Sequence, residues 1–472
     1  MAKEGNSPLA SYLRRITIAG CLAMVYITAV SSPTATEFYR ELGATDEHFG
    51  LLNGVPMIML GMQFFGAYLA NHLRRRKGWF MGLAIASRLL WLPIALLPCL
   101  FDQEFHPRLV APLIVLTALS GAMANLMTPL WFSWMGDLVP KRILNRYWGG
   151  RQWAMRLVWT ATFLLIAGAC YLMREQPARV LFPLFTVIGV IAGVIDILLF
   201  TSIEEPENVI LSERPPLEVF LEPLRDESYR SMVIYNSYRA FNTMIGATFM
   251  QVYVLEVLNI AVWEANLIWC TVGLGDALVS RLWGRILDRY GHRPVIIVCT
   301  AFKPAICLVF LFITPHYAAA ILTISFFFDA MLNSGQMLAM NGYMLKTSPR
   351  ENRSMFVASV TAITGIAGGI GAIAAGKIMG WAEGHSCVFW GREWTNYHLV
   401  FAISFLLRMA NLPMARMIRE PQSQHSLVVV NHLLGVWPLS ILLYPVGLYR
   451  RWRYPDPDPD EEEGAGTSSG GS

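Results

Sequence analysis

Long apolar runs recur along the whole chain of 472 residues. A helix needs roughly 20 apolar residues to cross the hydrocarbon core of a bilayer, and these runs are of that length. Only 15% of the residues are charged, which is well below the fraction of about one quarter in soluble domains. The runs lack the alternation of a barrel strand, so helices are the expected spanning form. The sequence therefore predicts an all-α integral membrane protein.

We expect twelve transmembrane helices in two pseudo-symmetric bundles of six. The first six are expected at about 13–38, 46–72, 78–100, 109–137, 149–172 and 179–201, and the second six at about 229–256, 260–284, 294–314, 317–345, 353–379 and 396–418. In the first helix Pro33 follows Ser31 and Ser32, so a kink is expected there. The bundles then occupy residues 1–201 and 229–420.

Three segments are expected outside the bundles. Residues 202–228 are rich in Glu and interrupted by Pro, which is typical of a polar cytoplasmic linker. Residues 421–454 are largely apolar with basic residues on both sides, so we expect a membrane-surface segment, an interfacial helix or a shallow hairpin, with a thirteenth span as the alternative. Residues 455–472 are acidic and then rich in Gly and Ser, and a disordered tail is expected.

The basic residues of the short loops gather on one side of this arrangement. That bias predicts that both termini are cytoplasmic in a multi-pass protein of the inner or plasma membrane. The first apolar run follows Arg14 and Arg15 but lacks a small-residue cleavage site, so it is interpreted as an uncleaved first span.

Residues 284–294 separate two of the expected helices and are predicted to form a short cytoplasmic hairpin loop. Gly284 is expected to let two helix backbones approach closely. Asp288 lies near a helix C-terminus, where the macrodipole disfavours an anion, so it needs a cationic partner. Arg289, Arg293 and basic residues of other helices are the candidates. The glycine run from Gly365 to Gly376 is likewise expected to serve close packing.

The pattern Gly284-x-x-x-Asp288-Arg289-x-Gly291-x-Arg293 resembles the loop signature of the major facilitator superfamily of transporters. In that family the signature lies between the second and third helices of each six-helix half. The resemblance implies two bundles around a central cavity that is lined by the first and fourth helices of each half.

The first half carries a weaker copy of this loop. Gly66 opens it, but Ala70 stands where the family has Asp. In the family, basic residues between the fourth and fifth helices meet the loop Asp, so the resemblance implies that Asp288 and Arg353 form a cytoplasmic gate. A role of Arg353 in membrane orientation alone is the alternative. The expected gate residues are Gly66, Asp137, Arg146, Gly284, Asp288, Arg289, Gly291, Arg293 and Arg353.

Polar residues inside the spans mark the expected solute cavity, because an ionised group within the bilayer is costly and defaults to a functional hypothesis. Asp329, Asn333 and Gln336 share one face of the tenth helix. The seventh helix carries Tyr235, Asn236, Arg239 and Asn242, and the first half adds Thr28, Asn125, Thr128 and Trp131.

Arg239 and Asp329 are expected to face each other across the cavity and so to offset the cost of their desolvation. A fixed structural ion pair between helices is the alternative, and Asp276 is a second candidate partner for Arg239. Lys303 is expected to be structural or lipid-facing, and Arg408 is expected to reach toward the membrane surface.

These features predict a secondary transporter that moves a small polar organic solute by alternating access. A buried carboxylate can bind and release a proton, so Asp329 is the candidate for proton coupling. A receptor without transport activity, built on the same scaffold, is an open alternative. A drug efflux antiporter is less favoured, because residues 157–172 lack the Gly-Pro signature of those antiporters.

Enzymatic chemistry is not indicated. The chain has no Ser/His/Asp set, no His-Glu-x-x-His and no phosphate-binding glycine-rich loop. Its seven Cys residues form no CxxC, so no metal site or disulfide framework is indicated. We expect no cofactor and no nucleic acid partner. The expected partners are the solute, the lipid bilayer and a proton, and the protein is expected to be a monomer.

Overall fold

The computed structural model describes residues 8–140, 143–207, 224–347, 353–389 and 392–420, together with Ser423, Ser426 and Val429. The first half contains α1 (Pro8–Ser31), α2 (Pro33–Glu41), α3 (Asp46–Ile58), α4 (Met62–His72), α5 (Lys77–Leu89), α6 (Trp91–Leu100), α7 (His106–Leu138), α8 (Leu144–Leu172) and α9 (Ala178–Leu198). The second half contains α11 (Glu227–Glu256), α12 (Val262–Tyr290), α13 (His292–Phe302), α14 (Ala305–Phe312), α15 (Ala318–Thr347), α16 (Arg353–Trp381) and α17 (Asn396–Met417). The predicted all-α class is confirmed.

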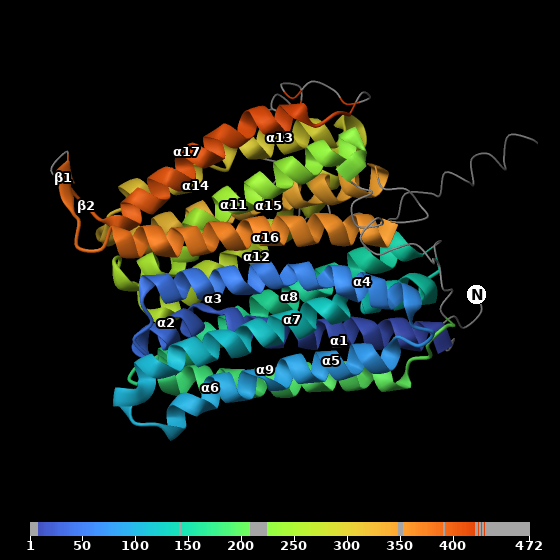
Figure 1. Cartoon of the computed structure of the whole chain (residues 1–472), viewed down its shortest axis with the longest axis horizontal. Coiled ribbons are helices and arrows are strands. Elements are labelled where there is room, and N and C mark those ends of the chain that lie inside the picture. The colour runs from blue at the N-terminus through green and yellow to red at the C-terminus, as the bar shows by residue number, and fades with distance from the viewer. Residues whose placement is uncertain are drawn as a thin grey trace, which may run out of the picture.

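The helices run side by side along one axis of the molecule, and the halves lie one above the other in Figure 1. Several of them are broken into two pieces that together make one span, such as α3 and α4. By length and composition, ten of the described spans could cross a membrane. The spans α11 and α12 are not among these ten, and both carry charged residues at mid-length, Arg239 and Asp276.

The two ends of the molecule, along the axis of the helices, carry different elements. At the end here called the hairpin end, two short strands, β1 (Cys387–Phe389) and β2 (Arg392–Trp394), pair antiparallel. The other end, here called the N-terminal end, carries the start of α1 and the end of α12 (Figure 1). The expectations for residues 421–454 and 455–472 fall almost wholly outside the described residues, as does most of the expected linker.

The predicted kink in the first span is confirmed. Helix α1 ends at Ser31, Ser32 is extended with φ −69° and ψ 162°, and α2 begins at Pro33. Proline has no backbone N–H and its ring clashes with the preceding turn, so the helix restarts rather than continues.

The predicted loop at 284–294 is wrong in extent. Helix α12 continues to Tyr290, and Gly291 alone separates it from α13. The helix continues because Trp283, Ile286 and Leu287 place buried side chains on one face. Gly291 has φ +90°, a conformation that favours glycine, and it supplies the whole turn.

Close backbone approach occurs between α3 and α16 rather than at Gly284. A Cβ built on Gly50 would lie 2.8 Å from the Cα of Gly376, and one on Gly54 would lie 2.8 Å from the carbonyl oxygen of Gly369. A Cβ on Gly284 meets no described heavy atom within 4 Å. Small residues let helices pack closely where lipid offers no hydrophobic driving force. The expectation for Gly284 is therefore wrong, and that for the run in the eleventh span is confirmed at Gly369 and Gly376.

We expect the substitution Gly376→Ala to destabilise the protein, because the added methyl group meets the Gly50 backbone at 2.9 Å. Overpacking of this kind costs about 1–3 kcal/mol. Thermal unfolding of the purified protein in detergent measures the effect. Gly284→Ala is the matched control and should not lower the unfolding midpoint, because Gly284 lies inside α12 and the added methyl group meets no described heavy atom within 4 Å. An equal effect of the two substitutions would contradict the assignment of the α3–α16 contact.

Candidate functional site

At the N-terminal end of the molecule, each half contains a glutamate with little exposed surface that accepts hydrogen bonds from the first backbone amides of a helix. Glu205 accepts a hydrogen bond from the backbone N–H of Arg76 and one of 3.1 Å from that of Lys77, where α5 begins. Glu420 accepts from the N–H groups of His292 and Arg293, at 2.8 Å each, where α13 begins. Free N–H groups and the macrodipole make a helix N-terminus favourable for a carboxylate.

These two glutamates were missed by the sequence analysis, although the sequence contains a signal for them. Glu205 belongs to Ile203-Glu204-Glu205-Pro206 and Glu420 to Ile418-Arg419-Glu420-Pro421, so the pattern Ile-x-Glu-Pro follows the last helix of each half. Its repetition is a mark of the internal duplication.

Two further side chains contact Glu420. His292 Nδ1 lies 3.0 Å and Lys346 Nζ 3.1 Å from its Oε1. Burial raises the pKa of the Glu420 carboxyl, but the hydrogen bonds from His292, from the Arg293 amide and from Lys346 outweigh burial and hold the pKa at about 2. The group is therefore ionised at any physiological pH.

Near Glu205 an ion pair has the opposite arrangement of charges from the expected gate, in which the loop carries the anion. Arg76 is fully buried, and its guanidinium lies 2.8 Å from Asp137 and donates to Ser133 Oγ at 2.6 Å. The loop after the second span thus contributes the cation and the fourth span the anion. Ala70 stands where the family signature has Asp.

The second-half gate stays a prediction. Asp288 and Arg289 are exposed, and within the described part of the chain Asp288 has no ion pair. The side chains of Arg146 and Arg353 lie outside the described residues. Arg293 donates to the carbonyl oxygen of Arg416 at 3.1 Å. Gly66 packs against the Leu126 carbonyl of α7.

In the middle of the second half, Asp329 forms its ion pair with Lys303, not with Arg239. Lys303 Nζ lies 3.1 Å from Asp329 Oδ2, and Arg239 Nε donates to Asn236 Oδ1 at 3.0 Å. The expected Arg239–Asp329 pair is therefore wrong. Lys303 stands at the break between α13 and α14, and α13 packs against α15 over a longer stretch than α11 does.

Asp276 is not the partner of Arg239 either. Its Oδ2 lies 3.0 Å from Arg156 Nη2, so this ion pair joins α12 of the second half to α8 of the first. Neither sequence periodicity nor loop charge indicated Arg156 as a functional residue.

Three of the predicted cavity residues are buried inside the second bundle. Tyr235 Oη lies 2.6 Å from Thr300 Oγ1, and Gln336 Nε2 donates to Tyr235 Oη at 2.7 Å. Asn242 is also buried, whereas Asn333 on α15 is exposed. The polar residues on this face of the tenth span therefore do not share one environment, because Gln336 is buried and Asn333 is exposed.

Arg408 does not reach the membrane surface, so that expectation is wrong. It is 5% exposed, and it donates to Ser404 Oγ and to the carbonyl oxygen of Thr243, each at 3.2 Å. With Arg239 and Lys303 it borders a small cavity of about 10 Å³. The lining residues are Arg239, Asn242, Thr243, Thr300, Lys303, Gln336, Arg408 and Asn411.

The first-half residues are held mostly by their own helix. Thr28 and Thr128 donate to the carbonyl four residues earlier, at 2.8 Å each. Asn125 Oδ1 accepts from Gln63 Nε2 at 2.9 Å. Trp131 carries the guanidinium of Arg151 over its ring at 5.0 Å, a cation–π contact that the sequence analysis missed.

Polar links between the two halves cluster at the hairpin end. Thr36 Oγ1 donates to Gln251 Oε1 at 2.6 Å, Asn266 to Thr34 at 3.2 Å, and Asn396 to Asp46 at 3.4 Å. Among the described residues, no side-chain hydrogen bond joins the halves at the N-terminal end. The hydrogen bonds therefore lie mainly at the hairpin end, and the halves also meet through the Arg156–Asp276 ion pair and through Ala67, which packs against Met355 and Ala358.

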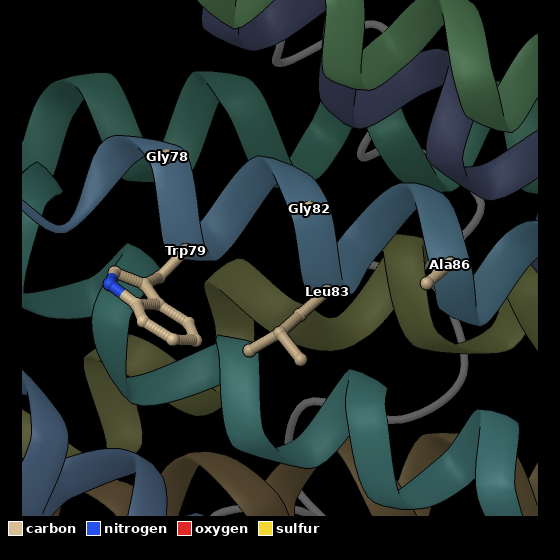
Figure 2. Close-up of a pocket in the computed structure, with 5 residues that line it drawn as sticks. All are labelled: Gly78, Trp79, Gly82, Leu83 and Ala86. Carbon is tan, nitrogen blue, oxygen red and sulfur yellow. The ribbon is translucent and has the colours of Figure 1, made fainter.

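A groove of about 390 Å³ lies apart from these groups, on the outer face of α5. Figure 2 shows Trp79 and Leu83 projecting beside Gly78, Gly82 and Ala86, all from this one helix. It offers a solute no side-chain hydrogen-bond partner beyond the Trp79 indole, so it is not the solute site.

Ten of the described spans are long and apolar enough to cross a membrane, and the Lys303–Asp329 ion pair lies between two of them. The sequence model described as Major Facilitator Superfamily matches residues 16–266 and 231–439. The chain belongs to the Major Facilitator Superfamily, and the resemblance noted from its loop signature is confirmed.

Solved structures share this fold. A variant of the nucleoside transporter NupG has a TM-score of 0.64 at 12% identity, with 86% of this chain and all of that chain covered. The D-xylose-proton symporter has a TM-score of 0.63 at 14% identity, with 89% of this chain and 100% of that chain covered. An inward-facing, unoccupied bacterial homologue of the lysosomal transporter Spinster has a TM-score of 0.56 at 15% identity, with 88% and 95% covered.

One curated relative is the protein named "Putative multidrug resistance protein MdtD" of Enterobacter sp. (strain 638). It is 26% identical over 186 residues, which span 39% of this chain and 39% of that protein.

We expect Glu420→Gln to lower the free energy of unfolding by about 2 kcal/mol, because a neutral amide satisfies the α13 amides and Lys346 less well than a carboxylate. The pKa of Glu420 is depressed, so its contribution is present above the ordinary pKa of a glutamate and is lost as the pH falls toward about 2. The difference between the unfolding midpoints of the variant and the native protein should therefore narrow as the pH is lowered from 7 to 3. Glu227→Gln, which removes an exposed ion pair to Arg419, is the control and should change little. A gap that persists undiminished at pH 3 would contradict the assignment.

Proposed function

We propose that this chain is a secondary active transporter that moves a small polar organic solute by alternating access. The observation that carries the proposal is the Lys303–Asp329 ion pair with Arg239 beside it, inside a membrane-spanning bundle. Ionised groups at such depth are costly and mark substrate or ion pathways. The hydrogen bonds that join the halves at the hairpin end support a state that is closed at that end.

Proton coupling through Asp329 is part of this proposal. Its side chain is 24% exposed, so a proton can reach the carboxylate, whereas Asp196 of the first half is 2% exposed. Protonation removes the charge that holds Lys303, and the released ammonium group can then contact the solute or another acceptor. Loading of a proton and rearrangement of the cavity are linked in this way.

Asp329→Asn tests the coupling. The amide cannot take up a proton, so we expect proteoliposomes with this variant to lose accumulation driven by a pH gradient while solute exchange at equal pH continues. The control Glu227→Gln should accumulate solute normally. Normal accumulation by Asp329→Asn, or uptake by the native protein that does not depend on the pH gradient, would contradict proton coupling through Asp329.

Binding measurements can identify the chemical class of the solute. A ligand that binds the folded state stabilises it, so the unfolding midpoint should rise with the right compound from a panel of sugars, nucleosides, amino acids and organic acids. Sugars and nucleosides come first, because structural relatives are a nucleoside transporter and a D-xylose-proton symporter. Binding without flux in vesicles would favour the receptor alternative.

Drug efflux is the second candidate, and the similarity to the MdtD protein favours it. Dye efflux from cells that express the chain separates the two functions. A transporter of small polar solutes should leave cationic dyes untouched.

We also propose that Asp288 and Arg353 form a cytoplasmic gate at the N-terminal end. If they pair in one state of the cycle, Asp288→Arg should slow uptake through charge repulsion, and the exchange of both residues, Asp288→Arg with Arg353→Asp, should restore most of it. The opposed control Asp288→Arg with Arg419→Asp should not restore uptake. A double exchange as slow as the single variant would rule out the pair.

A further inference from the structure

The small cavity inside the second bundle carries an excess of positive charge. Arg239, Lys303 and Arg408 all border it, and none of its eight lining residues is acidic. Both Arg239 and Arg408 lie close enough to repel Lys303 electrostatically. Asp329 compensates one of the three cations, through Lys303. Two positive charges are left without a carboxylate among the described residues that border the cavity.

In the first half, the cation at the corresponding position is neutralised by a carboxylate. Arg88 stands in the third span of its half, as Lys303 does in the second half, and its Nη2 lies 2.7 Å from Asp196 Oδ2 of the last span. In the second half the last span, α17, offers Arg408 and Asn411 instead. The last spans therefore differ: α9 supplies the carboxylate Asp196, whereas α17 supplies the cation Arg408, and the second-half carboxylate Asp329 stands on α15.

Polar atoms with no partner also face this cavity. Asn242 is 1% exposed, Gln336 2% and Asn411 3%, and the Nδ2 of Asn242, the Oε1 of Gln336 and the Oδ1 of Asn411 have no hydrogen-bond partner among the residues that the structure describes. Leaving such groups buried and unpaired costs about 1–3 kcal/mol each. A half-turn of the Asn411 carboxamide exchanges its oxygen and its NH₂ group, so it can also present donors.

The size and charge of the cavity select its occupant. About 10 Å³ holds one particle close to the size of a water molecule, so sulfate and phosphate are too large. A metal cation is excluded by three like charges. A water molecule would form hydrogen bonds with the polar atoms but would not neutralise the positive charge of Arg239 and Arg408.

We propose that this cavity binds one small monovalent anion, which contacts Arg239, Arg408 and the amide of Asn242. Its source is either a free halide such as chloride or one carboxylate oxygen of an organic anion. The proposal does not depend on transport activity, because it concerns occupancy of the resting protein.

Thermal unfolding of the purified full chain in an uncharged detergent tests the proposal. At constant ionic strength, replacing methanesulfonate, which is about as large as sulfate and carries no carboxylate, by chloride should raise the unfolding midpoint saturably, by on the order of 2 °C at 100-fold excess over the dissociation constant. Formate in place of chloride distinguishes the sources: stabilisation by chloride alone indicates a free halide, and stabilisation by formate as well indicates a carboxylate. Equal midpoints in methanesulfonate, chloride and formate would show a cavity that holds only water and would overturn the proposal.

Two variants locate the effect. Asn242→Asp places a carboxylate of nearly the same size in the cavity, so its midpoint should not depend on chloride. Arg408→Gln should weaken chloride binding by roughly tenfold or more, the effect of one lost charged hydrogen bond. Arg419→Gln removes a cation from an exposed pair and should keep the full chloride effect. An undiminished chloride effect in Asn242→Asp overturns the site.

Binding of radioactive chloride to the native protein keeps the proposal testable if the variants fail to fold. Saturable binding of about one chloride per chain, displaced by bromide, supports the site. A complete absence of binding of both chloride and labelled formate refutes it.

Discussion

The cost of keeping an ionised side chain away from water shapes this chain more than any other interaction. Inside a bilayer such a group must find an opposite charge or a set of hydrogen bonds. Arg88 with Asp196, Lys303 with Asp329 and Arg156 with Asp276 each meet this demand, and each joins two different spans. The ion pairs thus specify which helices are neighbours, a task that apolar contacts perform poorly where lipid is as apolar as the helices.

The same demand acts at helix ends, where four amides lack partners. Glu205 and Glu420 satisfy two amides each at the starts of α5 and α13. Because each glutamate follows the last span of its own half, it connects the end of the last span to the start of the third span in that bundle. The duplicated ancestry of the halves is therefore visible in their chemistry as well as in their order of helices.

The architecture could be predicted from sequence because run length and loop charge report on the membrane, which acts on every span alike. The kink at Pro33 was predictable because proline acts locally. Partners were not predictable. Periodicity placed Arg239 and Asp329 on suitable faces, but the choice of Lys303 depends on how α13 lies against α15. Arg408 was misjudged because distance from a helix end is a poor guide to burial when a neighbouring helix covers the position. The end of α12 was misjudged because basic residues at 285, 289 and 293 resemble a loop, although apolar residues between them keep the helical period.

The position of the two glutamate contacts has a mechanical consequence. Both lie wholly within one bundle, so when one bundle tilts against the other, neither is stretched or broken. The contacts between the bundles are the ones that must change in such a rocking motion: the hydrogen bonds of Thr36 with Gln251 and of Thr34 with Asn266, the Arg156–Asp276 ion pair and the packing of α3 on α16. The neutral hydrogen bonds contribute only about 1 kcal/mol each, so they oppose the motion weakly while each bundle keeps its shape.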